Sequence, residues 1–382
     1  MTEDTSQPGP GVLGTAAVRA LAPYVIGKPI SELARELGLN DDSDIVKLAS
    51  NENPLGPSPR ALQAMQHALA DVWLYPDGNG HDLKQALARH HRVSASQVTL
   101  GNGSNDLLVQ LAETFLTPQN SAVYSQYAFA IYAIAVQATG AQARVAPAFG
   151  ADHPMACGHD LDAMLERIAA DTRLVYIANP NNPTGTWNTP AQLSAFMQRV
   201  PQTVIVALDE AYFEYSRRVD CPDGSDLCAK YPNLVVLRTF SKAHGLAGVR
   251  VGYAISHPEV ADLLNRVRQP FNVNSVALAG AAASIGDAQQ VQRAVRLVSD
   301  GEAQIRAALP SLGVKLHPTA GNFVLADVGS NGQAVYERLL RHGVIVRPVG
   351  GYGLPSCLRI TFGTATQNQR LIAALAAVMQ ES

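Results

Sequence analysis

The chain has 382 residues, 47% of them hydrophobic and 16% charged, which is enough for two domains with sizeable cores. Its net charge of −3, without any run of lysine or arginine, excludes the basic surface typical of a nucleic-acid-binding protein. The four cysteines are scattered without metal-ligand spacing, which predicts no metal site and unpaired thiols in a reducing cytoplasm.

Residues 1–20 are predicted to form a mobile tail, because the segment up to Gly14 is polar and rich in glycine and proline. The tail lacks the basic and apolar regions of a secretory signal. Residues 21–48 are assigned to an N-terminal arm that forms part of a small domain. The longest apolar stretches, such as 128–136, are far too short to cross a bilayer.

The middle of the chain alternates helix-like and strand-like runs, a pattern typical of an α/β protein with many parallel strands. It is assigned to a large domain over 49–273. The predicted helices are 105–115 and 131–139, and the predicted strands are 122–124, 174–178, 204–208 and 234–238.

The pattern changes beyond Pro270, where helices and strands no longer alternate regularly. This part is assigned to a smaller α+β domain over 274–382. The predicted helices are 273–285, 288–309, 333–341 and 367–379, and the predicted strands are 323–327, 344–347 and 358–361.

Three polar side chains follow the carboxyl ends of predicted strands: Asn182, Asp209 and Lys242. Open α/β sheets gather their ligand-binding groups at this edge, so we expect the three to converge on one crevice. A lysine that can bond an aldehyde, a carboxylate for a ring nitrogen and a cation for a phosphate together suit pyridoxal 5'-phosphate. Arg250 supplies the cation, and Ser241 is placed to help it.

Each of these residues also has a simpler interpretation when it is considered alone. A Ser-Lys pair is usually a solvated surface lysine, and a lone Asp209 would be a helix cap or a strand-end ion pair. Asp209 follows an apolar run, so it is expected to be buried and to need a cationic partner. Tyr212 and Asn182 could both reach the ring hydroxyl oxygen, or they could be a core tyrosine and an Asn-Pro turn.

The segment 101–105 leads into a predicted helix, whose free N–H groups predict an anion site for the phosphate. Phe129 is a candidate to stack on the ring, or a plain core aromatic. Arg359 and Arg347 lie within apolar strand-like runs, where a guanidinium needs an anion. That anion is a substrate carboxylate or second acidic group, or else a structural salt-bridge partner.

Together these residues resemble the fold-type I pyridoxal-phosphate enzymes of the aspartate aminotransferase superfamily, and most of all the histidinol-phosphate aminotransferases. The resemblance covers nearly the whole chain. It is carried by 179–185 (Asn-Pro-Asn-Asn-Pro-Thr-Gly), 209–212 (Asp-Glu-Ala-Tyr) and 239–250, with 49–54 and 75–78 similar to the subfamily's N-terminal segment.

The resemblance implies a role for each candidate residue. Lys242 bonds the cofactor and acts as catalytic base, Asp209 holds the ring nitrogen, and Asn182 and Tyr212 hold the ring oxygen. The phosphate ligands are Ser104, Asn105, Ser241 and Arg250. Arg359 binds the substrate α-carboxylate, and Arg347 lies near the substrate phosphate.

The resemblance also implies a homodimer with shared active sites. Tyr75 then reaches the partner's cofactor phosphate, and Tyr24 reaches the partner's substrate. One departure from the family pattern lies at 127–129, where many relatives have Pro-Thr-Tyr or a similar triplet. Phe129 can still stack, but it lacks the hydroxyl for a hydrogen bond.

The reaction that the resemblance implies transfers the amino group of L-histidinol phosphate to 2-oxoglutarate in two half-reactions. Two other reactions use the same fold and cofactor: transamination of an aromatic amino acid, and decarboxylation of a phosphorylated amino acid. A regulatory protein built on this fold would need a DNA-binding domain, and the residues before Leu21 are too few to form one.

Overall fold

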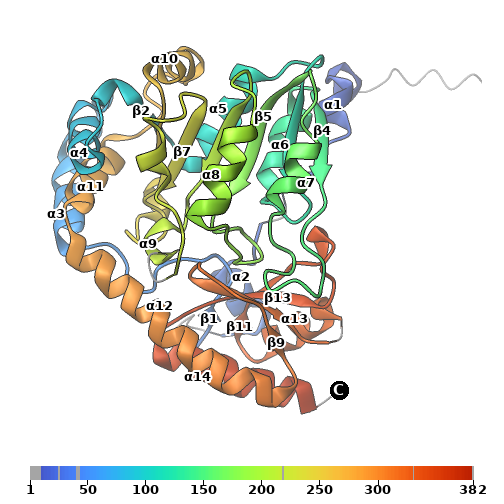
Figure 1. Ribbon diagram of the computed structural model, residues 1–382. Helices are drawn as coiled ribbons and strands as arrows, with labels where there is room; N and C mark the ends of the chain where they lie inside the picture. The colour runs from blue at the N-terminus through green and yellow to red at the C-terminus, as the bar shows by residue number, and fades with distance from the viewer. Residues whose placement is uncertain (1–9, 25, 40–43, 217–218, 330, 381–382) are drawn as a thin grey trace, which may run out of the picture.

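The computed structural model describes residues 10–24, 26–39, 44–216, 219–329 and 331–380. Within them, seven strands form a large sheet in the order β2-β8-β7-β6-β5-β3-β4, with only β8 antiparallel to its neighbours (Figure 1). This confirms the predicted α/β class. Its strands are β2 (Val98–Gly101), β3 (Ser121–Ser125), β4 (Gln142–Ala146), β5 (Thr172–Ala178), β6 (Ile205–Asp209), β7 (Leu234–Thr239) and β8 (Gly252–Ile255).

Helices cover both faces of the large sheet, because alternate residues of each strand point to opposite sides. In β6, Val206 and Leu208 join one core, and Ala207 joins the other. The first face is covered by α3 (Pro59–Ala68), α4 (His81–His91), α7 (Leu161–Glu166), α8 (Pro190–Arg199) and α11 (Ser275–Ile285). The second is covered by α5 (Ser104–Phe115), α6 (Ala130–Ala138) and α10 (Pro258–Val267).

A second layer packs below the carboxyl ends of the large sheet (Figure 1). Its small sheet has the order β12-β13-β10-β9, and a separate parallel pair joins β1 to β11. The strands are β1 (Val46–Lys47), β9 (Lys315–Leu316), β10 (Phe323–Asp327), β11 (Val344–Ile345), β12 (Arg347–Pro348) and β13 (Cys357–Thr361). The helices of this half are α2 (Ile30–Glu36), α12 (Ala288–Ala308), α13 (Gly332–Arg341) and α14 (Ala365–Gln380), and the short α9 (Phe213–Ser216) follows β6.

The predicted single strand over 344–347 is in fact two. β11 pairs in parallel with β1, whereas β12 pairs antiparallel with β13 at the edge of the small sheet. Pro348 has no N–H to donate, so a strand that contains it is restricted to an edge position. Arg347 therefore lies in β12, at the edge of the small sheet.

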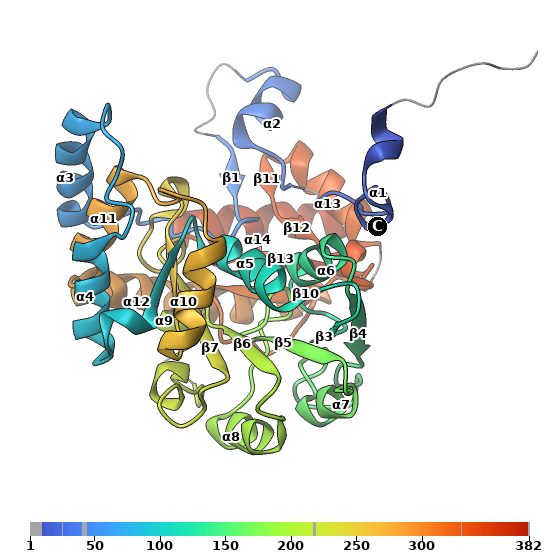
Figure 2. The same ribbon diagram turned by 90° about the horizontal axis from the view of Figure 1, so that it is seen from above.

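The predicted domain limits, 49–273 and 274–382, separate α11 from the large sheet. In the structure α11 lies beside α3 and α4 (Figure 2), and its Ala277 and Ala281 belong to the core of that sheet. Of the tail predicted over 1–20, residues 1–9 lie outside the described residues. Residues 10–20 contain a 3₁₀ turn and α1 (Ala16–Arg19), and Gln137 donates to the carbonyl of Ala17. The domain limits stay a prediction.

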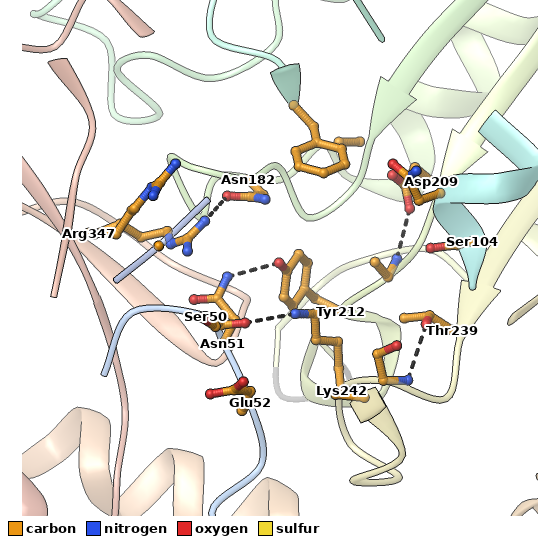
Figure 3. A pocket seen from close by; sticks show the side chains of 18 of the residues that line it. Ser50, Asn51, Glu52, Ser104, Asn182, Asp209, Tyr212, Thr239, Lys242 and Arg347 are labelled. Carbon is orange, nitrogen blue, oxygen red and sulfur yellow. Dashed lines mark hydrogen bonds between the residues drawn. The ribbon is translucent and has the colours of Figure 1, made fainter. Parts of the chain in front are cut away.

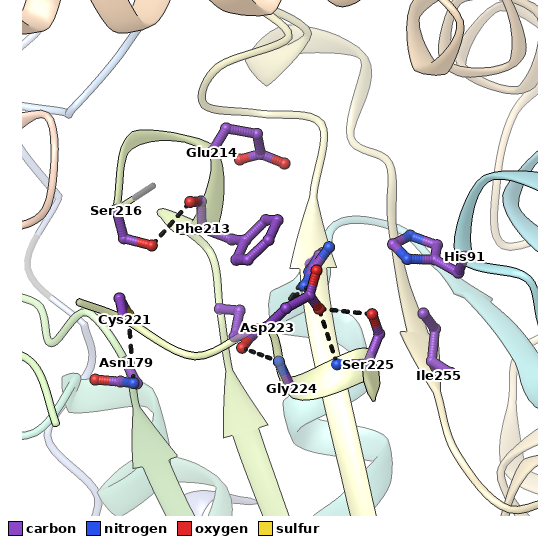
Figure 4. A network of polar contacts seen from close by, with 12 residues as sticks. His91, Asn179, Phe213, Glu214, Ser216, Cys221, Asp223, Gly224, Ser225 and Ile255 are labelled. Carbon is purple, nitrogen blue, oxygen red and sulfur yellow. Dashed lines mark hydrogen bonds and ion pairs between the residues drawn. The ribbon is translucent and has the colours of Figure 1, made fainter. Parts of the chain in front are cut away.

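A buried ion-pair network ties the ends of β6 and β7 together (Figure 4). Arg238 of β7 donates to Glu210 at 2.7 Å and to Asp223 at 2.6 Å, and its guanidinium lies 3.5 Å from the ring centre of Phe213. The other oxygen of Glu210 accepts from the N–H of Gly224 at 2.8 Å. Because Glu210 directly follows Asp209, this network fixes the strand end that carries Asp209.

We expect Arg238→Met to destabilise the apoprotein by about 3–5 kcal/mol at pH 8, because it leaves Glu210 buried without its cation. Burial raises the pKa of Glu210 to about 7 even beside Arg238. A carboxyl group whose pKa is raised on folding costs stability as pH rises, so the loss should be smaller at pH 5.

Urea unfolding of the apoprotein at the two pH values measures this difference. Arg144→Met is the matched control, because its ion pair with Asp171 is partly open to solvent, and we expect a much smaller loss. An equal loss in the two variants would contradict a structural role for the buried network.

Candidate active site

A cavity of about 460 Å³ lies between the two layers, at the carboxyl ends of β5, β6 and β7 (Figure 3). It brings together all but one of the residues predicted from the sequence. Those that line it are Tyr24, Ser104, Asn105, Phe129, Asn182, Asp209, Tyr212, Ser241, Lys242, Arg250, Arg347 and Arg359.

Lys242 lies on the turn after β7, and its amine points into the cavity (Figure 3). The amine donates to the carbonyl of Ser50 at 3.0 Å. Burial, helped by the positive charge of Arg359, lowers its pKa from 10.5 to about 7. A large fraction of this lysine is therefore an uncharged, nucleophilic amine near neutral pH.

Asp209 ends β6 and is 6% exposed. Tyr132 donates to one carboxylate oxygen at 2.9 Å, and the N–H of Ala211 donates to the other at 3.2 Å. Burial raises its pKa to about 6, while the hydrogen bond from Tyr132 opposes the rise. A cationic group in the cavity would favour the carboxylate, as the protonated nitrogen of a pyridine ring does.

The N-terminus of α5 faces the cavity, where Ser104 and Asn105 line it. Arg250 donates to Ser241 at 3.1 Å and so closes the opposite side. Gly103 allows this approach, since a Cβ atom at that position would lie 2.3 Å from the Arg250 guanidinium. Helix N–H groups, a hydroxyl and a guanidinium together suit a phosphate.

Two arginines enter the cavity from the small sheet. Arg359 of β13 is 7% exposed and donates to Asn182 at 2.5 Å and to the carbonyl of Ala49. Its Nε has no hydrogen-bond partner among the described residues, and burial lowers the pKa of its guanidinium. Arg347 of β12 lies over the ring of Tyr24, with 5.8 Å between its guanidinium carbon and the ring centre. Two guanidinium groups that line one cavity suit anionic ligands.

Several residues that line the cavity or contact its lining were not predicted from the sequence. Asn51 donates to the hydroxyl of Tyr212 at 2.9 Å, Glu52 and Thr239 line the cavity, and Tyr132 binds Asp209 from α6. The motif at 49–54 was noticed without a role for Asn51. The unusual feature of Asn51 is its positive φ of 55°. The sequence motif alone does not reveal this backbone conformation.

Tyr75 and Tyr24, the two residues expected to reach a partner's site, lie in different places. Tyr75 does not line the cavity; it is 84% exposed and stacks on Phe271 with 4.8 Å between ring centres. Tyr24 was expected in a partner's site, but it lines the cavity of its own chain, 6.5 Å from the ring centre of Phe129.

The donor set fits pyridoxal phosphate. An uncharged amine, a buried carboxylate and an anion site line one cavity, as the aldehyde, ring nitrogen and phosphate require. Among the described residues no cluster of His, Cys, Asp or Glu could hold a metal ion. In the same part of the chain no helix is both long enough and apolar enough to cross a membrane.

Residues 43–375 match the family model of class I and II aminotransferases. The chain belongs to this family. It is 54% identical over 367 residues to histidinol-phosphate aminotransferase 2 of Pseudomonas fluorescens (strain Pf0-1), covering 96% of this chain and 97% of that one. The histidinol-phosphate aminotransferase 2 of Pseudomonas aeruginosa is 53% identical over the same length, covering 96% and 98%.

A crystal structure of the histidinol-phosphate aminotransferase from Sinorhizobium meliloti, in complex with pyridoxal 5'-phosphate, superposes with a TM-score of 0.87. It is 32% identical and the match covers 96% of this chain and 97% of that one. The resemblance inferred from the sequence motifs is therefore confirmed, and so is the fold class.

We expect the rate at which this apo-aminotransferase combines with added pyridoxal phosphate to rise about tenfold per pH unit below pH 7 and to level off above it. Only the uncharged amine of Lys242 attacks the aldehyde, and its pKa is about 7. Stopped-flow absorbance from pH 5.5 to 10 measures the rate. The reaction of pyridoxal phosphate with Nα-acetyl-lysine under the same conditions is the control, because it shows how titration of pyridoxal phosphate itself changes the rate. A rate that rises steadily to pH 10 would contradict the lowered pKa.

Proposed function

We propose that this aminotransferase uses pyridoxal 5'-phosphate to transfer the amino group of L-histidinol phosphate to 2-oxoglutarate, giving imidazole acetol phosphate and L-glutamate in histidine biosynthesis. The observation that carries the proposal is the cavity in which Lys242, Asp209 and two arginines meet. Relatives that are 53–54% identical over almost their whole length and bear the name of this activity support it.

Lys242 and Asp209 have different tasks in this reaction. When bound, the cofactor supplies an aldehyde for the substrate amine and a ring that withdraws electrons. Lys242 would hold the cofactor through its aldehyde, and its amine would be placed to take the proton from the substrate α-carbon. Asp209, already oriented by Tyr132 and Ala211, keeps the ring nitrogen protonated. Ser104, Asn105, Ser241 and Arg250 hold the phosphate, while Asn182 and Tyr212 hold the ring oxygen.

The two arginines must accept different anions in the two half-reactions. L-Histidinol phosphate has a phosphate and no α-carboxylate, whereas L-glutamate and 2-oxoglutarate have two carboxylates each. Arg359 therefore serves the α-carboxylate of the dicarboxylic substrates, and Arg347 serves the phosphate of the amino donor. Both anions suit a guanidinium, which presents its N–H groups in pairs. Arg359 also donates a hydrogen bond to Asn182, which holds the ring oxygen in this proposal. The same arginine therefore binds the substrate anion and orients a residue that contacts the cofactor.

The functional unit is a homodimer in this proposal, and Tyr75 binds the partner's cofactor phosphate. Large apolar side chains around Tyr75 are exposed in the single chain: Leu69, Val72, Trp73, Leu74 and Phe271. A second copy would bury them, as dimer interfaces do. We place the enzyme in the cytoplasm because its four thiols are unpaired. Sedimentation of an active monomer would contradict the dimer.

Two alternatives keep the same cofactor and fold. An aromatic aminotransferase would not need Arg347 for a phosphate. A decarboxylase would orient the carboxylate bond of its substrate, instead of the α-hydrogen, perpendicular to the ring. Because histidinol phosphate has no carboxylate to lose, activity with it separates the main proposal from the decarboxylase.

We expect kcat/KM with 2-oxoglutarate as acceptor to be higher for L-histidinol phosphate than for L-phenylalanine. Arg347→Met should lower the value for histidinol phosphate about 10- to 100-fold, the usual effect of losing a charged hydrogen bond, and should change the value for phenylalanine much less. A coupled assay for glutamate measures both. Equal or better use of phenylalanine by the unchanged enzyme would favour the aromatic alternative.

A further inference from the structure

Asn51 connects the two layers of the molecule at the cavity. It is 1% exposed and lies between β1 and α3, in the left-handed region with a φ of 55°. It contacts Thr361 of β13 in the small sheet and Tyr212, which follows β6 of the large sheet. Figure 3 shows its amide group directed at the Tyr212 hydroxyl. The backbone carbonyl of Asn51 accepts from Asn322 at 3.0 Å, so the residue is held at several points.

The hydrogen bonds of Asn51 have a fixed direction. Its backbone N–H can only donate, and it donates to Thr361 Oγ1 at 3.0 Å. The Thr361 hydroxyl then gives its own proton to Asn51 Oδ1, also at 3.0 Å. With its oxygen facing Thr361, the side-chain amide turns its NH₂ group toward Tyr212, where Nδ2 lies 2.9 Å from the hydroxyl oxygen.

This direction determines where the Tyr212 proton points. The hydroxyl oxygen accepts from Asn51, so its own proton must point elsewhere. Arg359, a charged neighbour of Tyr212, has only donors and cannot accept that proton. Tyr212 lines the cavity, so the proton is directed at whatever acceptor the cavity holds.

We propose that Asn51 and Thr361 are positioning residues that fix the Tyr212 hydroxyl as a hydrogen-bond donor to the ring oxygen of bound pyridoxal phosphate. The inference rests on the proposed use of that cofactor. It adds that the donor direction depends on the small sheet, because Thr361 belongs to β13 whereas Tyr212 follows β6 of the large sheet. The two layers must be correctly placed for Tyr212 to present its proton.

A purely structural role for Asn51 would be to tolerate the left-handed backbone. Glycine adopts this conformation without strain and aspartate tolerates it nearly as well as asparagine, so neither substitution should disturb the fold through φ. The two differ in chemistry. Asn51→Gly removes the donor, whereas Asn51→Asp replaces the donor with an acceptor of the same shape, which draws the Tyr212 proton away from the cavity.

The first test compares the dissociation constant for pyridoxal phosphate among these variants by fluorescence titration. We expect Asn51→Asp to weaken binding about 10- to 100-fold and Asn51→Gly to have a smaller effect, since a water molecule can replace the lost donor. The pH at which the bound cofactor changes its absorbance should rise in the same order. A ring oxygen without its donor carries more negative charge and holds the shared proton more tightly.

The second test uses Thr361, and it decides the matter if Asn51→Asp does not fold. Thr361→Val removes the hydroxyl that orients Asn51, so binding should weaken and the absorbance midpoint should rise. Thr361→Ser keeps the hydroxyl and should restore both. Thr172→Val is the matched control, because that buried hydroxyl bonds Ser121 on the large sheet and lies outside the cavity lining.

Equal affinities and midpoints for Asn51→Asp and Asn51→Gly would overturn the proposal and leave only the backbone role. Unchanged values in Thr361→Val would overturn the part assigned to Thr361. Failure of the unchanged enzyme to bind pyridoxal phosphate would instead overturn the proposed function.

Discussion

Desolvation of the Lys242 amine is the constraint on which the rest of the site depends. An amine that stayed solvated would be charged at neutral pH and could neither attack an aldehyde nor remove a proton. Burial lowers its pKa to about 7, and Arg359 adds an unfavourable positive charge. In the proposed function Arg359 also binds a substrate anion, so one side chain would serve both the substrate pocket and the lowered pKa of Lys242.

The large sheet supplies the rigid frame for this arrangement. Asp209 ends β6, Lys242 follows the adjacent parallel strand β7, and the network around Arg238 ties the ends of these strands together. The charges that would be costly alone are therefore held in fixed relation to one another. The small sheet contributes the two arginines and Thr361, so a complete site needs both layers.

Much of this could be predicted from the sequence, because apolar runs that end in polar residues mark strand ends. Asp209 follows such a run directly, Lys242 comes a few residues after another, and Arg359 lies inside a third. The split between β11 and β12 was not predicted, since an apolar run does not show which partner each residue pairs with. Asn51 was missed for a related reason. Its importance lies in a backbone conformation and in a contact with Thr361, 310 residues away.

The proposed role of Tyr75 requires a second chain, because Tyr75 is exposed at the surface of the single chain. The central claim, that Lys242 bonds the cofactor, can be tested without any substrate. The enzyme is incubated with pyridoxal phosphate, reduced with borohydride to make the bond permanent, and digested for peptide mass spectrometry. The account predicts the added mass on the peptide that contains Lys242, and its loss in Lys242→Ala. A label on another lysine, or no label, would contradict it.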